Sequence, residues 1–369
     1  MWTITTDKDW DWLRRHYEWV RDMEEVPQDP VHHAEGNVAI HTRMVLTALQ
    51  QLGGYKQLPA QDQEMLWAAA LLHDVEKRST TVHETDGSIS SKGHSKKGTQ
   101  TARQILYTQI PTPFLMREQM VQLVRYHGMP IWAIERRDLA RVIIETSVMV
   151  DTSMLALLAR ADALGRVCND QTDLLYRIDL FEALCQEYDC WGQPKAFQTP
   201  HARFHYFNKT DSDPGFVPFD NFSATVVMLS GLPGAGKDRY VQQHYKDWPV
   251  INLDDIRRKN KIAPTDKSGN GTVVQLAKEQ AREYLRKKQH FVWNATNITR
   301  QMRAQLVELF VAYKAYVKLV YVEVPYATLH RQNKDREAMV PGKAVDKLVS
   351  KLEVPAPWEA HEVIYYIKE

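Results

Sequence analysis

Cysteine is scarce in this chain, which has only 3 in 369 residues: Cys168, Cys185 and Cys190. None of them forms a Cys-x-x-Cys pair, which argues against a disulfide framework and a zinc ribbon and favours a reducing compartment. No segment approaches the roughly 18 consecutive apolar residues that a transmembrane helix needs. The first residues also lack the apolar core of a secretory signal peptide. These absences predict a cytoplasmic protein without a membrane partner.

An excess of one charge sign is also absent, since 47 basic residues face 46 acidic ones. The balance conceals an asymmetry, because residues 1–223 carry a net charge of −7 and residues 224–369 one of +8. A basic second half suits an anionic ligand such as a nucleotide or a nucleic acid. An acidic first half suits either bound cations or a solvated surface, and composition does not choose between them.

Strand patterns are missing from the first half of the chain. Segments 37–52, 63–77 and 153–167 repeat apolar residues at helical spacing, whereas residues 191–223 are rich in helix-breaking proline and glycine. From residue 224, helical stretches alternate with five short β-branched runs, over 225–231, 249–255, 290–296, 315–324 and 362–368. This alternation is typical of a parallel sheet flanked by helices. We predict an α + α/β protein with a helical domain over 1–190, a linker over 191–223 and an α/β domain over 224–369.

The sharpest motif opens the α/β region. An apolar strand, residues 225–229, leads into Gly231-Leu-Pro-Gly234-Ala235-Gly236-Lys237-Asp238. This is a P-loop arrangement: the glycines let backbone N–H groups surround an anion, the next helix directs its positive end at the phosphates, and Lys237 reaches them. Asp238 stands where the motif has Ser or Thr. Its carboxylate is a candidate Mg²⁺ ligand, or else it only contacts the first turn of the helix.

Polar residues follow the next two predicted strands. The second strand is expected to end in Asp254-Asp255-Ile256-Arg257-Arg258, at the edge where an open α/β sheet binds ligands. Asp254 could accept a proton from an attacking hydroxyl or hold Mg²⁺, and the alternative is a helix cap. Asn294, Thr296 and Asn297 close the third strand, where they could hold an acceptor or simply end the strand as turn residues.

Arginines recur near the C-terminus, within His330-Arg331-Gln-Asn333-Lys334-Asp-Arg336. On a short helix they could close over the phosphates as a lid and stabilise the transferring group. The alternative is a solvated, charged helix face.

Taken together, these motifs resemble the polynucleotide 5′-kinase family, which pairs a P-loop with an Asp-Asp-x-Arg motif and an arginine lid. The resemblance covers almost all of the second domain. It implies that Lys237 contacts the β- and γ-phosphates, that Asp254 is the general base for a 5′-hydroxyl, and that Arg257 binds the reactive end. It further implies that Arg336 stabilises the phosphoryl group, with Arg331 as a second candidate. The implied nucleotide site comprises Gly231, Gly234, Ala235, Gly236, Lys237, Asp238, Arg331 and Arg336.

Histidines and aspartates recur along the helical domain in a set order: His41, His73 and Asp74, His94, His127, and Asp162. Taken singly, each is more often an ordinary core or surface residue. Imidazole and carboxylate ligands together suit transition metals rather than Ca²⁺ or Mg²⁺. The order and the flanking residues resemble the HD phosphohydrolase superfamily, whose members with two extra histidines commonly hold two metals. The resemblance implies that all six side chains are metal ligands and that Lys77 contacts substrate phosphate. His33 either joins the site or is a turn residue.

An HD domain followed by a P-loop domain resembles the bacterial HD-Pnk type of end-healing enzymes. That resemblance implies NTP- and Mg²⁺-dependent phosphorylation of 5′-OH ends of RNA or DNA. It also implies removal of 3′-phosphate, 2′-phosphate or 2′,3′-cyclic phosphate by two divalent metals such as Mn, Co, Ni, Cu, Zn or Fe. The products would suit a polynucleotide ligase.

Two other readings stay open: an HD nucleotide hydrolase fused to a small-molecule kinase, and a regulator whose HD half only senses nucleotide. The segment 203–209, Arg-Phe-His-Tyr-Phe-Asn-Lys, either packs its aromatic side chains between the domains or follows a single strand.

Overall fold

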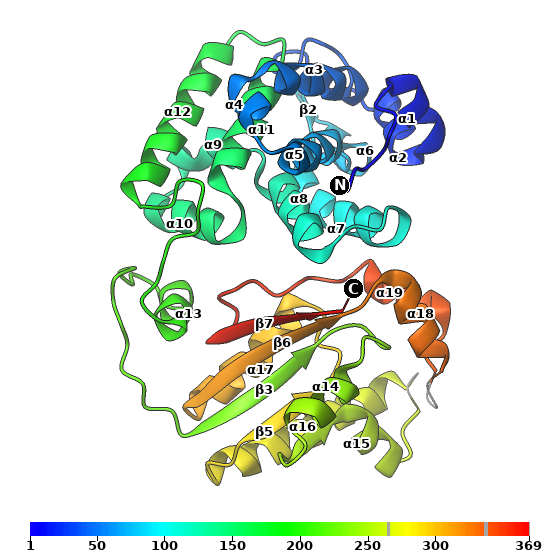
Figure 1. Cartoon of the computed structure of the whole chain (residues 1–369), viewed down its shortest axis with the longest axis vertical. Coiled ribbons are helices and arrows are strands. Elements are labelled where there is room, and N and C mark those ends of the chain that lie inside the picture. Colours follow the sequence, from blue (N-terminus) through cyan, green and yellow to red (C-terminus); the bar gives the residue numbers. More distant parts are fainter. Residues whose placement is uncertain (264–265, 336–338, 369) are drawn as a thin grey trace. The chain divides into compact units, whose positions relative to one another are not determined.

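The computed structural model describes residues 1–263, 266–335 and 339–368. The chain divides into two compact units, Met1–Ala196 and Phe197–Glu369. The first is helical and the second is built on a parallel sheet (Figure 1). The predicted fold class is confirmed.

The first unit is a bundle of short helices that bury one another's apolar faces. The predicted helix over 37–52 is α3, capped by the Asn37 side chain, which accepts from the Ile40 N–H at 2.9 Å. Helix α5 runs through the middle of the core, with Leu66, Leu71 and Leu72 fully buried. The helices are α1 (Trp10–His16), α2 (Glu18–Arg21), α3 (Val38–Gln51), α4 (Gly53–Gln57), α5 (Ala60–Leu72), α6 (Lys77–Thr80), α7 (His94–Gln104), α8 (Phe114–Tyr126), α9 (Met129–Trp132), α10 (Leu139–Met149), α11 (Thr152–Leu164) and α12 (Gln171–Glu187). Short 3₁₀ turns lie at Asp22–Glu25 and Ala133–Glu135, and a π-helical turn lies at Ile105–Gln109.

One feature of this unit was not predicted. Strands β1 (Val82–His83) and β2 (Ile89–Ser90) form a small antiparallel hairpin between α6 and α7. Each strand has only two residues, so there is no alternating pattern for the sequence to display.

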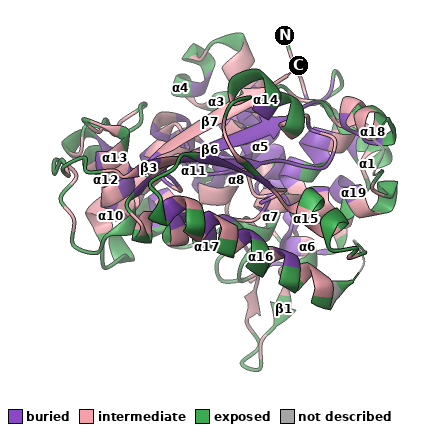
Figure 2. Cartoon of the chain, turned by 90° about the horizontal axis from the view of Figure 1, so that it is seen from below, coloured by how far each residue is buried: buried purple, intermediate pink, exposed green. Residues whose placement is uncertain are grey.

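The second unit contains a five-stranded sheet with the order β4-β5-β3-β6-β7, and all neighbouring strands are parallel. Its strands are β3 (Ala224–Ser230), β4 (Val250–Asn252), β5 (Phe291–Asn294), β6 (Ala315–Glu323) and β7 (Glu362–Ile367), so all five predicted strands are present. The central strand β3 pairs with β6 along its whole length, from Ala224 opposite Ala315 to Ser230 opposite Tyr321. Both strands are largely buried (Figure 2), as expected for a sheet covered by helices.

The helices that surround this sheet place the loops that matter for function. They are α13 (Pro200–Asn208), α14 (Lys237–His244), α15 (Leu253–Lys259), α16 (Lys267–Arg286), α17 (Arg300–Ala312), α18 (Tyr326–Lys334) and α19 (Gly342–Val349). Helix α14 follows β3 directly, so the P-loop lies at the carboxyl end of the central strand. The strand order reverses beside β3, and such a switch point is where open α/β sheets bind ligands.

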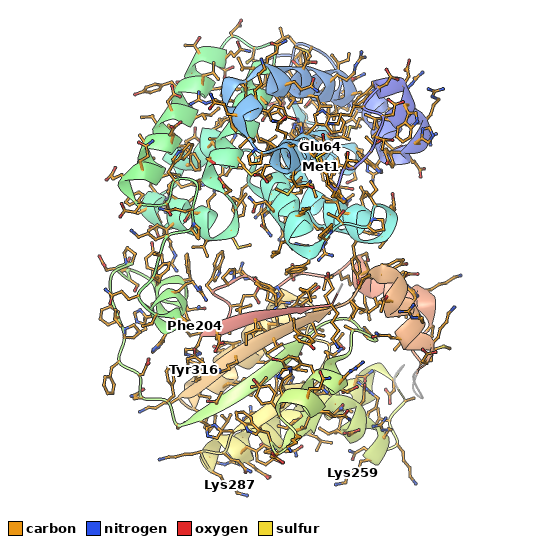
Figure 3. The ribbon with its side chains drawn as sticks, in the orientation of Figure 1. Met1, Glu64, Phe204, Lys259, Lys287 and Tyr316 are labelled. Atoms are coloured by element: carbon orange, nitrogen blue, oxygen red, sulfur yellow. The ribbon has the colours of Figure 1, made fainter. Side chains whose placement is uncertain are left out.

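The segment interpreted as a linker contains helix α13, and its residues from Phe197 onward belong to the second unit. Phe204 lies in the core of that unit together with Val226 of β3, and its ring is 4.3 Å from that of His361. Figure 3 labels Phe204 and Tyr316, which both contact His361. The aromatic side chains of α13 therefore pack onto the sheet of their own unit.

Among the described residues, no single helix is long and apolar enough to cross a membrane, and only the bent pair of α10 and α11 reaches that length and composition jointly.

Candidate functional site

The first unit brings all six predicted metal ligands together. His41 projects from α3, and Asp162 from α11. The remaining four lie at helix ends: His73 and Asp74 directly after α5, His94 at the first position of α7, and His127 directly after α8. Apart from His94, which is partly exposed, these side chains are buried.

His41, His73 and Asp162 form one group of candidate ligands. His41 Nε2 lies 3.1 Å from Asp162 Oδ1. Two ligands that bind one ion at about 2.1 Å stand roughly 3.0–3.4 Å apart, so this spacing fits a shared metal.

Asp74, His94 and His127 form a second group. Asp74 Oδ1 lies 3.3 Å from His94 Nε2 and 3.8 Å from His127 Nε2. The other oxygen, Oδ2, lies 3.2 Å from His73 Nε2 and 3.8 Å from His41 Nε2. Asp74 thus presents one oxygen to each group, which is the arrangement of a carboxylate that bridges two metals.

The histidine rings are held by their other nitrogen. The Nδ1 atoms of His73, His94 and His127 lie within 2.8 Å of the carbonyl oxygens of Ala70, Ser91 and Val124. When such a ring is neutral, an Nδ1–H that donates to a carbonyl leaves Nε2 unprotonated and directed into the site, and metal-binding histidines are oriented in this way.

Three atoms of the cluster are buried without a hydrogen-bond partner: His41 Nε2, His73 Nε2 and Asp74 Oδ1. Unpartnered buried polar atoms are costly, and here they converge on one place. The residues present therefore fit a pair of divalent cations.

The charge states of the two aspartates and of His127 also fit metal binding. Burial opposes ionisation of Asp74, but the charges of His73 and Lys77 hold its pKa well below the usual value. Burial likewise opposes ionisation of Asp162, but the Arg166 guanidinium, bonded to it at 2.6 Å, holds its pKa well below the usual value. Burial and, to a smaller extent, the neighbouring His94 charge together lower the pKa of His127 to about 3. At neutral pH these aspartates are anionic and His127 is neutral, as metal ligation requires.

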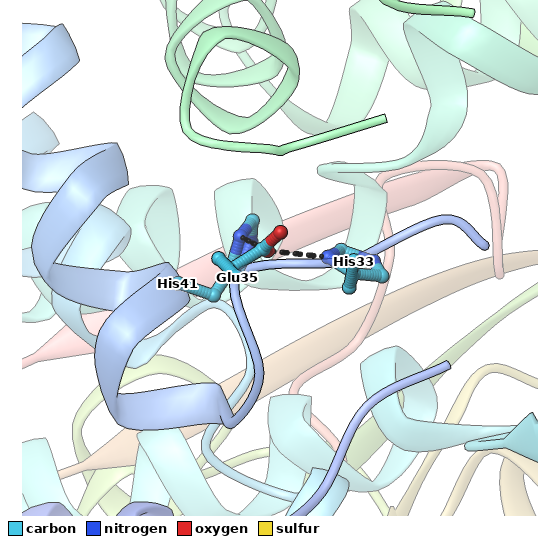
Figure 4. Close-up of side chains that lie close together, drawn as sticks. All are labelled: His33, Glu35 and His41. Atoms are coloured by element: carbon cyan, nitrogen blue, oxygen red, sulfur yellow. Dashed lines mark hydrogen bonds and ion pairs between the residues drawn. The ribbon is translucent and has the colours of Figure 1, made fainter. Parts of the chain in front are cut away.

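Glu35 is a candidate site residue that the sequence analysis missed. Its Oε1 lies 2.8 Å from both His33 Nδ1 and His41 Nδ1 (Figure 4), and its Oε2 accepts from the Val167 N–H at 2.9 Å. A carboxylate behind a ligating histidine raises that ligand's basicity and fixes its ring. The hint in the sequence was the run His33-Ala-Glu35, but one carboxylate in a turn is too common to single out.

A cavity of about 430 Å³ opens onto the cluster. His33 lines it, as do Lys77 and Arg166. Lys77 Nζ lies 2.9 Å from Asp74 Oδ2 and donates to Gln28 Oε1 at 2.6 Å. Basic side chains beside the ligand cluster give the cavity the character of a phosphate site.

The P-loop has the backbone that its glycines require. Gly231, Gly234 and Gly236 all have positive φ, at 151°, 86° and 93°. A Cβ on Gly231 would lie 2.4 Å from the Val322 carbonyl oxygen, whereas a Cβ on Gly236 would meet nothing within 4 Å. Ala235, within the same loop, is buried.

Lys237 and Asp238 lie at the start of α14. Lys237 Nζ donates to the carbonyl oxygens of Gly231 and Leu232, both at 2.9 Å, so it spans the loop that would hold the phosphates. Asp238 Oδ1 accepts from Asn294 Nδ2 at 2.6 Å. The structure thus brings Asp238 and Asn294, two predicted site residues, together at the carboxyl ends of β3 and β5.

Asp254 lies in a helix rather than at a strand end. Strand β4 stops at Asn252, whose side chain caps α15 by accepting from the Asp254 N–H at 2.9 Å. Asp254 and Arg257 form an ion pair one turn apart, and Arg257 Nε also donates to Asn270 Oδ1 at 3.0 Å. Asp255 forms a separate exposed pair with Arg258.

Asn297 and Thr296 have different surroundings from those of Asn294. Asn297 is buried, and its amide donates to the Leu229 carbonyl at 2.7 Å, so it positions β3. The Thr296 carbonyl accepts from the Gly231 N–H at 2.9 Å and thereby ties the end of β5 to the P-loop.

Helix α18 carries Arg331, which is exposed and lies 3.3 Å from Thr328 Oγ1. Asn333 is buried beside Gly234 and bonds both backbone groups of Val340. Arg336 lies outside the described residues.

Comparison with known proteins supports both halves of this description. Residues 38–166 match the HD domain family and residues 226–355 match an AAA domain family, so the chain joins an HD domain to a P-loop domain. A candidate kinase from Chloroflexus aurantiacus J-10-fl is 13% identical, with a TM-score of 0.34, over 40% of this chain and 86% of that one. A gluconokinase from Sinorhizobium meliloti 1021 is 14% identical, with a TM-score of 0.28, over 40% of this chain and 84% of that one. Neither similarity indicates the substrate of this chain.

Proposed function

We propose that this chain heals nucleic-acid ends with two sites of opposite chemistry. The HD domain removes a 3′-phosphate, a 2′-phosphate or a 2′,3′-cyclic phosphate, and the P-loop domain phosphorylates a 5′-hydroxyl from an NTP. The observation that carries the hydrolytic half is Asp74, whose two oxygens each face one histidine-containing ligand group. The carboxylate–guanidinium pair of Asp254 and Arg257 supports the kinase half.

In the HD domain, the chain supplies ligands and phosphate contacts. His41, His73 and Asp162 would hold one divalent transition metal, and Asp74, His94 and His127 the other. Bound there, the metals would supply an activated hydroxide and a clamp on phosphate oxygens. Lys77 lies beside Asp74, where it would bind a non-bridging phosphate oxygen and orient the ester for in-line attack.

In the P-loop domain, the chain orients the phosphates and accepts a proton. The N–H groups of residues 231–238 would surround the β- and γ-phosphates, and Lys237 would exchange its two carbonyl partners for phosphate oxygens. Asp238, held by Asn294, is the candidate for Mg²⁺. Asp254 would take the proton of the 5′-hydroxyl, while Arg257 binds the reactive end and Arg336, with Arg331, neutralises the charge on the transferring group.

Two features favour a nucleic-acid strand as the common substrate. The half of the chain with the kinase carries a net charge of +8, which suits a polyanion. The two reactions also act on complementary ends, because one leaves a 3′-hydroxyl and the other a 5′-phosphate. A polynucleotide ligase requires both.

The test is mass spectrometry of an RNA strand that carries 5′-OH and 2′,3′-cyclic phosphate ends. The strand is incubated with the full chain, ATP, Mg²⁺ and Mn²⁺. We expect a phosphate to be gained at the 5′ end and the 3′ end to become a diol. If the strand is unchanged while ATP and a mononucleotide are consumed, the chain is instead a nucleotide hydrolase fused to a small-molecule kinase.

Paired variants assign each activity to its site. Asp254→Ala should abolish phosphoryl transfer and leave the phosphatase, and Asp255→Ala, which breaks the neighbouring ion pair on the same helix, should leave both activities. Asp74→Asn should abolish the phosphatase and leave the kinase, and Asp189→Asn is its exposed control. Loss of both activities in either folded active-site variant would contradict the assignment to two sites.

A further inference from the structure

The cavity of the HD domain holds a feature that phosphate chemistry leaves unexplained. Trp132 lines it together with His127 and Lys77, and 43% of Trp132 is exposed. Charged and metal-ligating groups line the same cavity and suit a phosphate, whereas an exposed indole contributes nothing to the binding of a phosphate. It therefore points to a further part of the substrate.

The position of Trp132 is fixed by the backbone of the site itself. Helix α9 begins two residues after the ligand His127 and is anchored by Ile131, which is fully buried, while Trp132 ends it. The Trp132 N–H donates to the Gly128 carbonyl at 3.2 Å. The ligand and the indole are thus joined by one rigid helical turn.

One face of the indole is already covered. The Arg177 guanidinium lies over the Trp132 ring, 5.4 Å from its centroid. Arg177 Nη1 donates to Glu135 at 2.7 Å and Nε donates to Asp173 at 2.7 Å, so the guanidinium is held from two sides. Arg177 does not line the cavity, whereas Trp132 does, so the cavity is bounded by a part of the indole that Arg177 does not cover.

We propose that Trp132 is a stacking platform for the base of the nucleotide whose phosphate ester is hydrolysed at the metal cluster. This rests on the proposed function of the HD domain and narrows it: the substrate is a phosphate ester that carries a nucleobase, with no fixed choice of base. Stacking on an indole tolerates every base because each has a π face. Arg125 and Arg136, which line the same cavity, suit phosphate oxygens of that nucleotide or of its neighbour.

The test compares two substrates of the full, metal-loaded chain: a nucleoside 2′,3′-cyclic phosphate and glycerol 2-phosphate, which has no ring. The measured quantity is the ratio of their kcat/KM values. Trp132→Ala should lower that ratio about tenfold or more, mainly through a higher KM for the nucleotide, because the base lies away from the reacting atoms. Trp132→Phe should restore most of the ratio. Tyr176→Ala, which removes an exposed aromatic side chain on α12 outside the cavity, should leave it unchanged.

A second variant tests the Arg177 guanidinium that covers one face of the Trp132 ring. Arg177→Met uncovers the indole without touching the cavity, so the ratio should fall by a smaller factor, about threefold. If Trp132→Ala leaves the ratio unchanged, or lowers kcat equally for both substrates, the platform is overturned while the phosphatase assignment stands. If neither substrate is hydrolysed by the wild-type chain with any divalent metal, the proposed function fails and the platform fails with it.

Discussion

At the scale of single residues, the geometry of the candidate metal site depends on groups outside the two proposed ligand sets. Each ligating histidine contacts a backbone carbonyl or Glu35 through Nδ1, so its Nε2 is oriented before any cation arrives. The ligands alone do not define the site, because a freely rotating imidazole would lose entropy on binding. Glu35 is the clearest case, since its side chain is only 1% exposed yet bonds two histidines.

Glu35→Gln should weaken metal binding at the group that contains His41. The substitution removes the negative charge behind His41 and places an amide NH₂ where Oε1 or Oε2 now accepts hydrogen bonds. We expect the apparent metal affinity to fall about 10- to 100-fold with kinase activity unchanged. Isothermal titration with Mn²⁺ measures the affinity. Glu187→Gln, at an exposed position on α12, is the matched control, and wild-type affinity in Glu35→Gln would contradict the role.

His361 gives the second unit a pH-dependent stability. Burial lowers its pKa to about 3, with the charge of His201 acting in the same direction, and the Val317 N–H donates to its Nδ1 at 3.1 Å. Because the unfolded chain protonates this group near the ordinary histidine pKa of 6.5, the unfolded state binds more protons between the two pKa values. The contribution to stability is therefore fully present above the unfolded pKa and is lost as pH falls toward the folded pKa.

His361→Asn tests this contribution, because the Asn oxygen can still accept from Val317 but does not titrate. The variant should lose less stability between neutral pH and pH 4, by about 2–3 kcal/mol. Calorimetry at a series of pH values follows the unfolding transition that ATP shifts upward, which identifies the second unit. A variant whose pH profile runs parallel to that of the wild type would refute the assignment.

At the scale of elements, the P-loop is a turn that tolerates almost no side chain at its first glycine. Gly231→Ala would combine a φ of 151° with a Cβ 2.4 Å from the Val322 oxygen of β6. We expect loss of ATP binding and a destabilisation of the second unit by about 3 kcal/mol. Equilibrium binding of a fluorescent ATP analogue and calorimetry measure both. Gly53→Ala, in helix α4 with open space around it, should leave ATP binding intact, and an active Gly231→Ala would contradict the close approach.

Elements that depend on a contiguous run of residues with a clear pattern could be predicted from the sequence, and elements without such a run could not. The five strands of the second unit were predicted because each is a β-branched run bounded by turn residues, and α3 because its apolar residues repeat at helical spacing. The hairpin of β1 and β2 was missed because two-residue strands carry no pattern. Strand β4 was extended too far, to Asp255, because the apolar Leu253 continues the strand pattern, whereas the Asn252 side chain caps α15 and the helix begins at Leu253.

The two candidate sites also differ in how local their sequence signals are. The P-loop is contiguous, so its residues were named together from one motif. The metal ligands come from α3, α11 and the ends of α5, α7 and α8, and only their order along the chain identified them. Glu35 and Trp132 carry no motif at all, since their roles depend on what α3 and α12 place beside them.

At the scale of the whole molecule, the two units differ in the atoms they offer to a cation. The HD domain presents imidazole nitrogens and buried carboxylates, which prefer transition metals. The P-loop domain offers the Asp238 carboxylate beside a phosphate-binding loop, and Mg²⁺ prefers such oxygen ligands together with phosphate. One chain therefore offers two candidate cation sites with different donor atoms, so the choice of metal can separate them.

Removal of metal should separate the two activities of the intact chain. After dialysis against a chelator, Mg²⁺ alone should restore 5′-phosphorylation of an RNA strand and leave the 2′,3′-cyclic phosphate end intact. Addition of Mn²⁺ should then restore the phosphatase, with activity saturating near two ions per chain if both ligand groups are filled. The wild-type chain and Asp74→Asn are titrated side by side, with both ends of the strand followed by mass spectrometry. Full recovery of both activities with Mg²⁺ alone would show that the nitrogen-rich donor set does not select the metal, and a wild-type response in Asp74→Asn would exclude this cluster as the hydrolytic centre.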